Sequence, residues 1–343
     1  MSGTSLDGLD LVLASFTGED DHWRFSILKA VTIPYSESWK HDLTAAPAMT
    51  GEQLIALHKA YGRYLGIQVR DFLKDAGIRP ALVASHGHTV FHQPEKGLVF
   101  QLGDGNVIAA ETGLPVVFDF RSPDVALGGQ GAPLVPAGDR LLFTEYAACL
   151  NLGGFANISY ETARGRIAYD LCPANLALSH VISVTGREYD KDGETGRKGR
   201  VDSRLLECLD NLDYYRLSPP KSLGREWLEK FFFPCSDRSR ASVEDKLRTV
   251  YEHIATQIQR GITFRKPARM LVTGGGAHNI FLIELLKKKC PVEIVVPSGE
   301  ITDYKEALIF AFLGVLRMKN RVNCLASVTG AKKDSSCGLV VNI

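Results

Sequence analysis

Three short glycine-rich segments constrain the fold of this chain more than any other feature of its sequence. They are residues 1–10 (MSGTSLDGLD), 150–159 (LNLGGFANIS) and 272–279 (VTGGGAHN). Each joins a strand-like run to small residues, and glycine lets backbone N–H groups approach an anion closely. One such loop alone could simply make a tight turn. Together they predict phosphate contacts in the first two loops and a nucleoside contact in the third, which an apolar helix from Ile280 is expected to follow.

The two best-known phosphate-binding signatures do not account for these loops. The sequence contains no G-x-x-x-x-G-K-[ST] segment. It also has no G-x-G-x-x-G segment that opens a helix after a strand and is followed by an acidic residue about 20 positions later. P-loop and Rossmann nucleotide-binding folds are therefore disfavoured.

Short apolar runs alternate with segments of helical period along the chain. Strands are predicted at residues 11–15, 81–85, 116–118, 148–152 and 270–273. Helices are predicted over 54–72 and 247–258, the second with Ser242 and Asp245 as a capping pair. This alternation predicts an α/β fold. Because 343 residues exceed what one core usually organises, we expect two lobes, 1–135 and 136–343, with the final segment able to return to the first.

Two segments are predicted to lack regular structure. Residues 122–143 mix Gly, Pro and polar residues densely, which indicates a lobe junction or a binding loop. Residues 189–199 are charged and glycine-rich, so they are expected to form an exposed, mobile connection.

Charge and cysteine content narrow the classes of partner. Forty Lys and Arg oppose 39 Asp and Glu, without the basic stripe of a nucleic-acid binder, so small-molecule partners are expected. The seven cysteines are scattered and form no C-x-x-C pair, which predicts reduced thiols in a cytosol. The N-terminus has no basic start and apolar run, and no apolar stretch approaches about eighteen residues. A cytoplasmic protein that does not associate with membranes is expected.

Asp170 is the strongest candidate for a catalytic group. It follows the short run 166–169, which predicts a strand, and precedes a turn that contains Pro173. A carboxylate held at such a strand end is well placed to act as a general base. On the residues alone, the alternative is that Asp170 caps the helix expected from Leu176 or closes a turn.

Other polar residues allow both functional and structural interpretations. Glu306 is predicted one turn into a helix capped by Thr302 and Asp303, where it could bind substrate or simply face solvent. The packing side of that helix is expected to carry Ala307, Phe310 and Gly314. Asp7 and Asp10 could hold Mg²⁺ through water or could cap turns.

Three histidines and an arginine complete the candidate residues. His86 and His88 alternate along a predicted strand end and should point the same way, with His92 nearby. No third or fourth zinc ligand lies close in sequence, so lining a sugar cleft is favoured over a metal site. Arg121 could pair with Asp119 or with a carboxylate of a substrate.

Nine segments resemble, in order, the motifs of the anhydro-N-acetylmuramic acid kinase family. They are MSGTSLDGLD, ASHGHTVFHQP, QLGDG, DFRSPDVALGGQGAPLVP, LNLGGFANIS, YDLCPAN, PKSLGREW, VTGGGAHN and DYKEALIFAFLG. The likeness spans nearly the whole chain, from Met1 to about Ala331. The resemblance implies a two-lobed, actin-like (ribonuclease H-like) ATPase fold of the actin, hexokinase and heat-shock chaperone superfamily, with ATP in the interlobe cleft.

The resemblance also implies roles for individual residues. Asp170 would be the catalytic base, and Asp7 would be the residue linked to Mg²⁺. The substrate-binding residues would be His86, Gln130, Asn175 and Glu306. The ATP-binding residues would be Gly3, Thr4, Ser5, Leu6, Asp7, Gly8, Leu9 and Asp10 in the first phosphate loop, Gly153 and Gly154 in the second (152–156), and Gly274, Gly275, Gly276 and Asn279 in the adenosine loop.

The implied activity is that of a phosphotransferase with an alcohol acceptor, acting with ATP and Mg²⁺. Asp170 would deprotonate a water that attacks the anomeric carbon of 1,6-anhydro-N-acetylmuramic acid, while the released O6 takes the γ-phosphoryl group. The product would be N-acetylmuramic acid 6-phosphate, formed in peptidoglycan recycling and amino-sugar catabolism. A homodimer is implied as well.

Two departures from the family pattern are visible. Cys172 and Ala174 stand where the family generally has glycines, which we expect to alter pocket shape more than chemistry, since Asp170 and Asn175 are present. The family has an apolar strand before the first phosphate loop, whereas this sequence begins inside the loop, so weaker support and lower ATP affinity are expected. Two other functions stay open: another sugar or acid kinase of the superfamily, or a non-catalytic ATP-binding paralogue.

Overall fold

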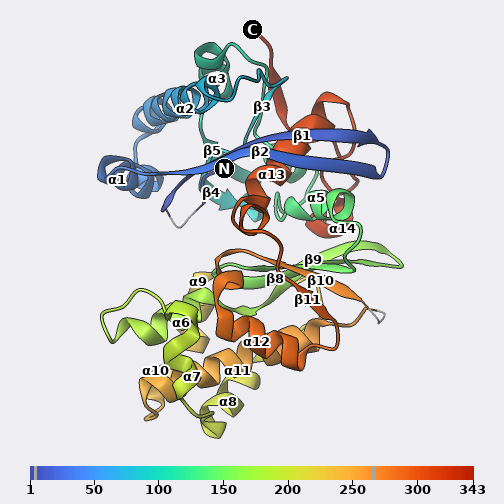
Figure 1. The fold of residues 1–343 in the computed structure, drawn as a ribbon. Coiled ribbons are helices and arrows are strands. Elements are labelled where there is room, and N and C mark those ends of the chain that lie inside the picture. The colour runs from blue at the N-terminus through green and yellow to red at the C-terminus, as the bar shows by residue number, and fades with distance from the viewer. Residues whose placement is uncertain (4–5, 265–267) are drawn as a thin grey trace. The chain divides into compact units, whose positions relative to one another are not determined.

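The computed structural model describes residues 1–3, 6–264 and 268–343. The chain divides into two compact units, residues 1–142 together with 304–343, and residues 143–303. Both units combine helices with strands, which confirms the predicted α/β class (Figure 1). The predicted ATP contacts at Thr4 and Ser5 lie outside the described residues.

The first unit contains the early strands and helices and the C-terminal segment. Its strands are β1 (Gly8–Glu19), β2 (His22–Pro34), β3 (Val83–Ser85), β4 (His88–Gln93), β5 (Leu98–Leu102), β6 (Val116–Phe118) and β12 (Leu339–Val341). Its helices are α1 (Glu37–Ala45), α2 (Gly51–Lys74), α3 (Gly105–Thr112), α4 (Ser122–Ala126), α5 (Val135–Leu142), α14 (Ala326–Thr329) and most of α13 (Gly299–Met318).

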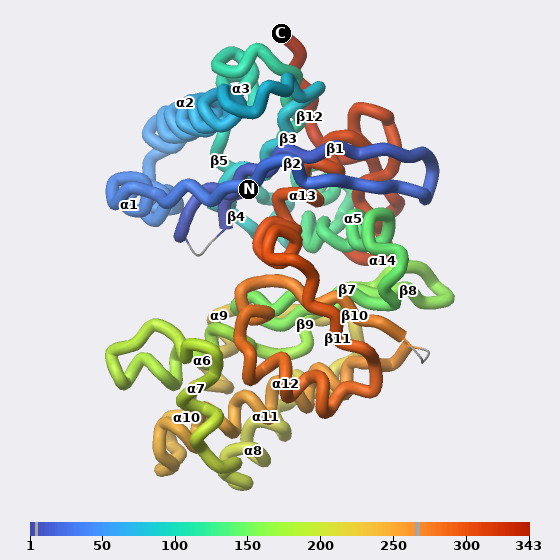
Figure 2. Tube along the Cα trace, in the orientation of Figure 1, coloured from blue at the N-terminus to red at the C-terminus, as the bar shows by residue number. Residues whose placement is uncertain are grey.

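The strands of the first unit form three small sheets. β1 and β2 make a long antiparallel hairpin (Figure 2), β4 pairs with β5, and β6 lies between β12 and β3. The predicted helix over 54–72 is confirmed as α2, which begins with a capping box between Thr50 and Gln53. Its apolar side, including Tyr61 and Leu65, packs in one core with Leu11 of β1.

Helix α13 packs closely against β3 in this unit. A Cβ at Gly314 would lie 2.7 Å from the Cβ of Ala84, so only glycine permits this approach. The predicted packing side is confirmed, because Ala307 and Phe310 are also buried. The helix begins at Gly299 rather than at Thr302, so Glu306 lies deeper in the helix than the predicted first turn.

The second unit is built on one five-stranded sheet. Its strands are β7 (Ala148–Leu152), β8 (Phe155–Thr162), β9 (Gly165–Pro173), β10 (Arg269–Thr273) and β11 (Glu293–Val295). Its helices are α6 (Asn175–Ser183), α7 (Glu194–Lys198), α8 (Ser203–Asp210), α9 (Arg225–Trp227), α10 (Phe233–Arg238), α11 (Val243–Gly261) and α12 (Ile280–Lys289).

The sheet of the second unit has the order β11-β10-β7-β8-β9. β7, β8 and β9 form an antiparallel meander, and β10 and β11 continue the sheet parallel to β7. An antiparallel meander extended by parallel strands in this order is the ribonuclease H-like arrangement that was expected. The predicted helix over 247–258 is confirmed as α11, whose Ser242 hydroxyl accepts a hydrogen bond from the Asp245 N–H at 3.2 Å.

Two predictions of irregular structure are wrong. Residues 122–143 contain helices α4 and α5, and Pro123 is tolerated because it lies in the first turn of α4, where no N–H partner is needed. Residues 189–199 form a short turn and helix α7 instead of an exposed connection. The reason is the buried carboxylate of Asp190, which accepts hydrogen bonds from the N–H groups of Thr195 (2.9 Å) and Gly196 (3.0 Å).

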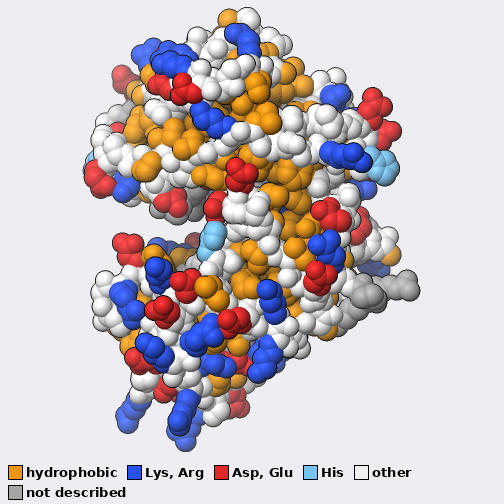
Figure 3. Space-filling model, in the orientation of Figure 1, with side chains coloured by type: hydrophobic (Ala, Val, Ile, Leu, Met, Phe, Trp, Pro, Cys, Tyr) orange, Lys and Arg blue, Asp and Glu red, His pale blue; other side chains and the backbone are white. Residues whose placement is uncertain are grey.

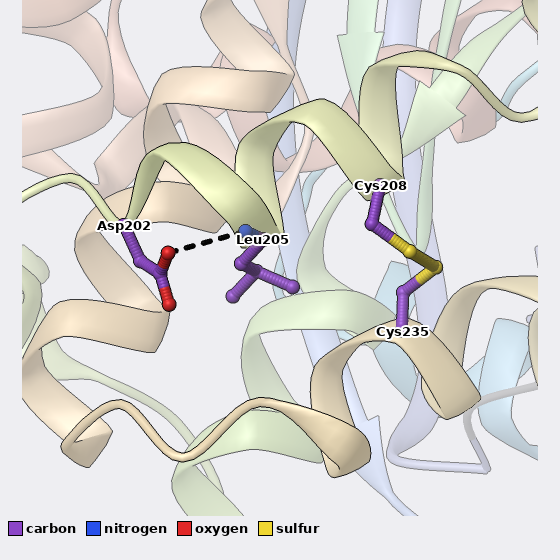
Figure 4. Close-up of a disulfide and its surroundings, with 4 residues drawn as sticks. All are labelled: Asp202, Leu205, Cys208 and Cys235. Carbon is purple, nitrogen blue, oxygen red and sulfur yellow. Dashed lines mark hydrogen bonds between the residues drawn. A yellow bond between two sulfur atoms is a disulfide. The ribbon is translucent and has the colours of Figure 1, made fainter.

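The prediction that all cysteines are reduced is also wrong. Cys208 of α8 and Cys235 of α10 form a disulfide with an S–S distance of 2.12 Å (Figure 4). The two residues are 27 positions apart, and no spacing motif in the sequence predicted that they would pair. The other five cysteines are thiols, and all are buried.

Within the described residues, the structure contains no helix long and apolar enough to cross a lipid bilayer.

Candidate active site

A row of polar side chains crosses the sheet of the second unit. Thr273 of β10 pairs with Asn151 of β7, Asn151 pairs with Asn157 of β8, and Asn157 pairs with Asp170 of β9. Paired residues on neighbouring strands have their side chains on the same face of a sheet. The four side chains therefore line one face, next to the glycine loops.

One member of this row has an unusual hydroxyl. Oγ1 of Thr273 is buried and has no hydrogen-bond partner among the described residues. Buried polar groups are normally paired, so an unpaired one needs an explanation. A polar group of a bound ligand would provide the missing partner.

The two glycine loops of the second unit lie against each other at one end of this row. A Cβ at Gly274 would come within 2.6 Å of Oδ1 of Asn151, and one at Gly276 within 2.8 Å of Leu152. Asn175, the first residue of α6, donates from its N–H to the carbonyl of Gly153 (3.1 Å) and from Nδ2 to the carbonyl of Leu152 (3.2 Å). The structure thus brings together 153–154, 274–276 and Asn175.

Asn279 is held within the protein. Its Oδ1 caps α12 by accepting from the Leu282 N–H at 3.0 Å, and its Nδ2 donates to the hydroxyl of Tyr251 at 2.8 Å. The side chain therefore secures the end of the adenosine loop. The apolar helix expected from Ile280 is confirmed as α12.

Asp170 lies inside strand β9 rather than at its end, and it does not cap α6, whose N-cap residue is Ala174. Its Oδ2 accepts a hydrogen bond from the Leu223 N–H at 2.8 Å, and its carbonyl accepts one from the hydroxyl of Tyr214 at 2.6 Å. Burial raises the pKa of Asp170 to about 6, although the Leu223 N–H opposes this shift. A carboxylate with this pKa can exchange a proton near neutral pH.

The two residues that replace family glycines point into the protein. Cys172 and Ala174 are fully buried in the core of the second unit. Burial also raises the pKa of the Cys172 thiol, so it is protonated and behaves as a small apolar side chain. These two replacements therefore fill core space next to Asp170.

In the first unit, His86 contacts protein groups through both ring nitrogens. Nδ1 donates to the carbonyl of Gly87 at 2.9 Å, and Nε2 accepts from Nη2 of Arg121 at 2.8 Å. Burial and the Arg121 guanidinium lower the pKa of His86 well below its usual value, so the ring is neutral. The predicted pairing of Arg121 with Asp119 is not what the structure has, because Arg121 bonds to His86 and, at 2.7 Å, to the carbonyl of Gly131.

His88 has a separate polar contact, in which its Nδ1 lies 3.0 Å from the hydroxyl of Ser2. Within the part of the chain that the structure describes, no group of three or more His, Cys, Asp or Glu residues could hold a metal ion.

Gln130 is an exposed residue in a loop anchored by a buried carboxylate. Asp124 accepts hydrogen bonds from the Gly131 N–H (2.8 Å) and from the Thr329 hydroxyl (2.8 Å). A Cβ at Gly129 would lie 2.2 Å from Oδ2 of Asp124, which explains the glycine. Glu306 is likewise exposed, in contrast to the neighbouring buried Lys305.

The first glycine segment is shorter than predicted. Gly8, Leu9 and Asp10 belong to strand β1, and the side chain of Leu9 lies in the core. Gly8 is required because a Cβ there would lie 2.7 Å from the carbonyl of Ile33 in β2. Oδ1 of Asp10 accepts a hydrogen bond from the Thr32 hydroxyl at 2.6 Å.

The remaining described loop residues are Gly3, Leu6 and Asp7. Leu6 has a φ of 56°, which is unusual for a bulky residue, and Asp7 is exposed. These residues keep the predicted loop position.

Sequence reasoning missed Asn151, Asn157, Thr273 and Asp124. The first two could have been noticed, since they interrupt apolar strand segments on either side of the turn at 153–154. Thr273 and Asp124 gave no such signal, because their importance depends on partners far away in the sequence.

Comparison with known proteins identifies the family. Residues 1–342 match the family model described as anhydro-N-acetylmuramic acid kinase. The chain is 35% identical to the anhydro-N-acetylmuramic acid kinase of Nitrosomonas europaea, over 99% of this chain and 98% of that protein. It is 36% identical to the one of Vibrio cholerae, over 99% and 96%.

A search of solved structures found more distant likeness. A ROK family glucokinase from Streptomyces griseus, in complex with glucose and AMPPNP, is 11% identical with a TM-score of 0.36, over 84% of this chain and 96% of that one. A TM-score this low supports no conclusion about function. The sequence matches, in contrast, span nearly the whole chain. The chain belongs to the anhydro-N-acetylmuramic acid kinase family.

Proposed function

We propose that this protein uses ATP to open and phosphorylate 1,6-anhydro-N-acetylmuramic acid, giving N-acetylmuramic acid 6-phosphate. Membership of the family supports the reaction. The observation that carries the assignment is Asp170, a carboxylate with its pKa raised to about 6 in a row of polar side chains beside two glycine loops.

Asp170 acts as the general base in this proposal. Its carboxylate takes a proton from a water molecule, and the water oxygen bonds to the anomeric carbon of the sugar. The bond from that carbon to O6 breaks, and O6 bonds to the γ-phosphorus as the bond from phosphorus to ADP breaks. The Leu223 N–H holds the carboxylate in one orientation, which a base needs for directional proton transfer.

The glycine loops are proposed to bind ATP. Gly153 and Gly154 would contact phosphates, while 274–276 would contact the adenosine, because neither loop carries side chains that would keep a ligand from the backbone. Gly3, Leu6 and Asp7 would form the corresponding loop of the first unit. Mg²⁺ would neutralise phosphate charge, and exposed Asp7 is the residue proposed to hold it through water.

The sugar is proposed to contact Glu306, Gln130 and Asn175. Exposure of Glu306 and Gln130 supports direct contact. His86, whose two ring nitrogens are already hydrogen-bonded, would instead orient Arg121.

A homodimer, a cytoplasmic location and a role in peptidoglycan recycling are further parts of this proposal.

Product mass tests the proposed reaction. The protein is incubated with MgATP and either anhydro-N-acetylmuramic acid or N-acetylglucosamine. We expect the anhydro sugar to gain one phosphate and one water. Phosphate without water on the other sugar would indicate another sugar kinase, and no product from either would indicate a non-catalytic ATP-binding protein.

The pH dependence of turnover follows from the pKa of Asp170. A general base must be ionised, so kcat should fall about tenfold per pH unit below about 6 and level off above it. The measurement is kcat at saturating substrate from pH 5 to 8, repeated with Glu306→Gln. A midpoint that persists near 6 in that variant supports Asp170, and one that disappears assigns the titration to Glu306.

Gly274→Ala should raise the KM for ATP by about five- to a hundredfold, corresponding to about 1–3 kcal/mol of local strain. Gly274 has a φ of 86°, and its Cβ would also contact Asn151 and the backbone of Leu152. Gly77→Ala is the matched control, because Gly77 has a φ of 62° with nothing within 4 Å of its Cβ. Equal KM values in the two variants would contradict a role of the 274–276 loop in ATP binding.

A further inference from the structure

Strand β9 is irregular at the residue that we propose as the base. Asn157 of β8 pairs with Asp170, and the neighbouring Ala156 pairs with Cys172, so the register skips Leu171. One extra residue on one strand is a β-bulge, which bends the strand and changes the direction of the adjacent side chains. The direction of the Asp170 carboxylate therefore depends on the contacts that hold the bulge.

Three groups from residues 214–223 contact Asp170. The Asp170 N–H donates a hydrogen bond to the carbonyl of Lys221 at 3.2 Å. The hydroxyl of Tyr214 donates to the Asp170 carbonyl at 2.6 Å, and the Leu223 N–H donates to Oδ2 at 2.8 Å. Strand β9 is the last in the order of the sheet, so the two bonds to the main chain occupy its outer edge. Segment 214–223 thus holds both the main chain and the carboxylate of Asp170.

Tyr214 and Lys221 also hold each other within this segment. Nζ of Lys221 lies 4.6 Å from the centroid of the Tyr214 ring, and it donates a hydrogen bond to the Tyr214 carbonyl at 3.2 Å. The Tyr214 side chain is buried, with the ring of Trp227 at 5.4 Å. A cation over an aromatic ring is attracted to it, so this contact keeps together two residues that bond to Asp170.

The next residue ties the segment to helix α11. The hydroxyl of Tyr215 lies 2.8 Å from Nε2 of His253, and Nδ1 of His253 lies 2.6 Å from Oδ1 of Asp210. Burial lowers the pKa of His253, although Asp210 opposes this shift, so the ring is neutral. A neutral ring has one donor nitrogen, which means that Nδ1 donates to Asp210 and Nε2 accepts from Tyr215. The main chain beside Tyr214 is therefore anchored.

The disulfide restrains the same segment. Cys208 of α8 and Cys235 of α10 are 27 positions apart, and segment 214–223 lies between them in sequence (Figure 4). Closing a loop in this way reduces the conformations that are open to it when it detaches. Cys208 is exposed and Cys235 is half-buried, so a small reductant can reach the bond.

We propose that Tyr214 is a positioning residue for Asp170, and that the Cys208–Cys235 disulfide keeps the segment that carries Tyr214 in place. Tyr214 bonds to the main chain of the bulge, and this contact keeps the carboxylate of Asp170 against the Leu223 N–H. Its effect on turnover rests on the proposed function, in which Asp170 is the base. Turnover then depends on the thiol–disulfide state of the protein.

Tyr214→Phe removes the hydroxyl and keeps the ring. We expect kcat with the anhydro sugar to fall about three- to tenfold, the equivalent of one lost hydrogen bond. The KM for ATP should stay the same, because the contacts of Tyr214 are with Asp170 and its own segment. The Leu223 N–H lowers the pKa of Asp170, so a loosened contact should move the midpoint of the kcat profile upward from about 6.

Tyr160→Phe is the matched control. Tyr160 is a tyrosine of the same unit with 5% exposure, against 6% for Tyr214, and its hydroxyl lies 2.7 Å from Oγ1 of Thr263. This variant should keep both kcat and the midpoint. A general loss of structure would lower kcat at every pH without moving the midpoint. An unmoved midpoint in Tyr214→Phe, or an equal change in Tyr160→Phe, would contradict the positioning role.

Hydrogen exchange after reduction tests the part of the disulfide. Charged side chains of both signs are interspersed over the face of the second unit that Figure 3 shows, so the uncharged dithiol dithiothreitol is the reductant. It gives two electrons and two protons to the disulfide, which becomes two thiols, and it closes to a cyclic disulfide itself. The other five cysteines are already thiols, so only this bond changes.

We expect the Leu223 and Asp170 amides to exchange at least about tenfold faster in the reduced protein. The amide of Leu150, a fully buried residue of β7, should exchange at the same rate in both forms. Equal exchange of Leu223 in the oxidised and reduced protein would overturn the role of the disulfide.

Exchange of Leu223 in Tyr214→Phe separates the positioning role from the proposed function, because it needs no turnover. Faster exchange supports the positioning role even if Asp170→Asn keeps near-normal kcat, in which case Asp170 is not the base. Unchanged exchange, together with a loss of kcat in Asp170→Asn, would leave the proposed function standing and show that Tyr214 does not position Asp170.

Discussion

Asp170→Asn lowers kcat by about a hundred- to ten-thousandfold, the range for loss of a general base. Asparagine keeps the shape of the side chain and can still accept the Leu223 N–H, but it cannot take a proton from water. The KM for ATP should change little, because Asp170 is not part of the glycine loops. Steady-state kinetics with the anhydro sugar measure both constants.

Stability separates lost chemistry from lost structure in this variant. Burial disfavours the ionised form of Asp170, so a neutral asparagine should leave the unfolding midpoint unchanged or slightly higher. Asp213→Asn, at an exposed site of the same unit, is the control and should keep full turnover. Near-normal kcat in Asp170→Asn would remove this residue from the mechanism.

Lys305→Met lowers the free energy of unfolding by about 3–5 kcal/mol, the usual consequence of breaking a buried ion pair from one side. Nζ of Lys305 lies 2.8 Å from Oδ1 of Asp139, and the two side chains are 5% and 4% exposed. Methionine replaces the aliphatic stem but leaves the Asp139 carboxylate without its cation in a buried place. Denaturant unfolding followed by circular dichroism measures the loss.

Two further variants show whether the buried charge is the cause. The double variant Lys305→Met with Asp139→Leu should recover most of the lost stability, because no uncompensated charge remains. Lys40→Met removes an ion pair of the same 2.8 Å length, but Lys40 and Glu37 are 41% and 89% exposed, so a loss of about 0–1 kcal/mol is expected. Equal losses of unfolding free energy in Lys305→Met and Lys40→Met would show that burial of the ion pair does not determine its contribution to stability.

Prediction from sequence was accurate where residues a few positions apart decide the structure. The strands at 116–118 and 148–152 appear with the predicted bounds, and Ser242 caps α11 as expected. It failed at 189–199, where a charged and glycine-rich composition indicated mobility. The carboxylate of Asp190 holds that segment from within, and the hydroxyl of Tyr251, 61 positions away, also bonds to it.

The sequence by itself determined the α/β pattern, the glycine loops, Asp170 as a candidate base and the family resemblance, because strand periodicity, helix caps and motifs are local. Tertiary structure alone decided the row from Thr273 to Asp170, the Cys208–Cys235 disulfide and the buried ion pair of Lys305 with Asp139. Each of these depends on register or packing between segments that are distant in sequence. Burial and pairing of a side chain are properties of its neighbours in space, and a linear pattern does not contain them.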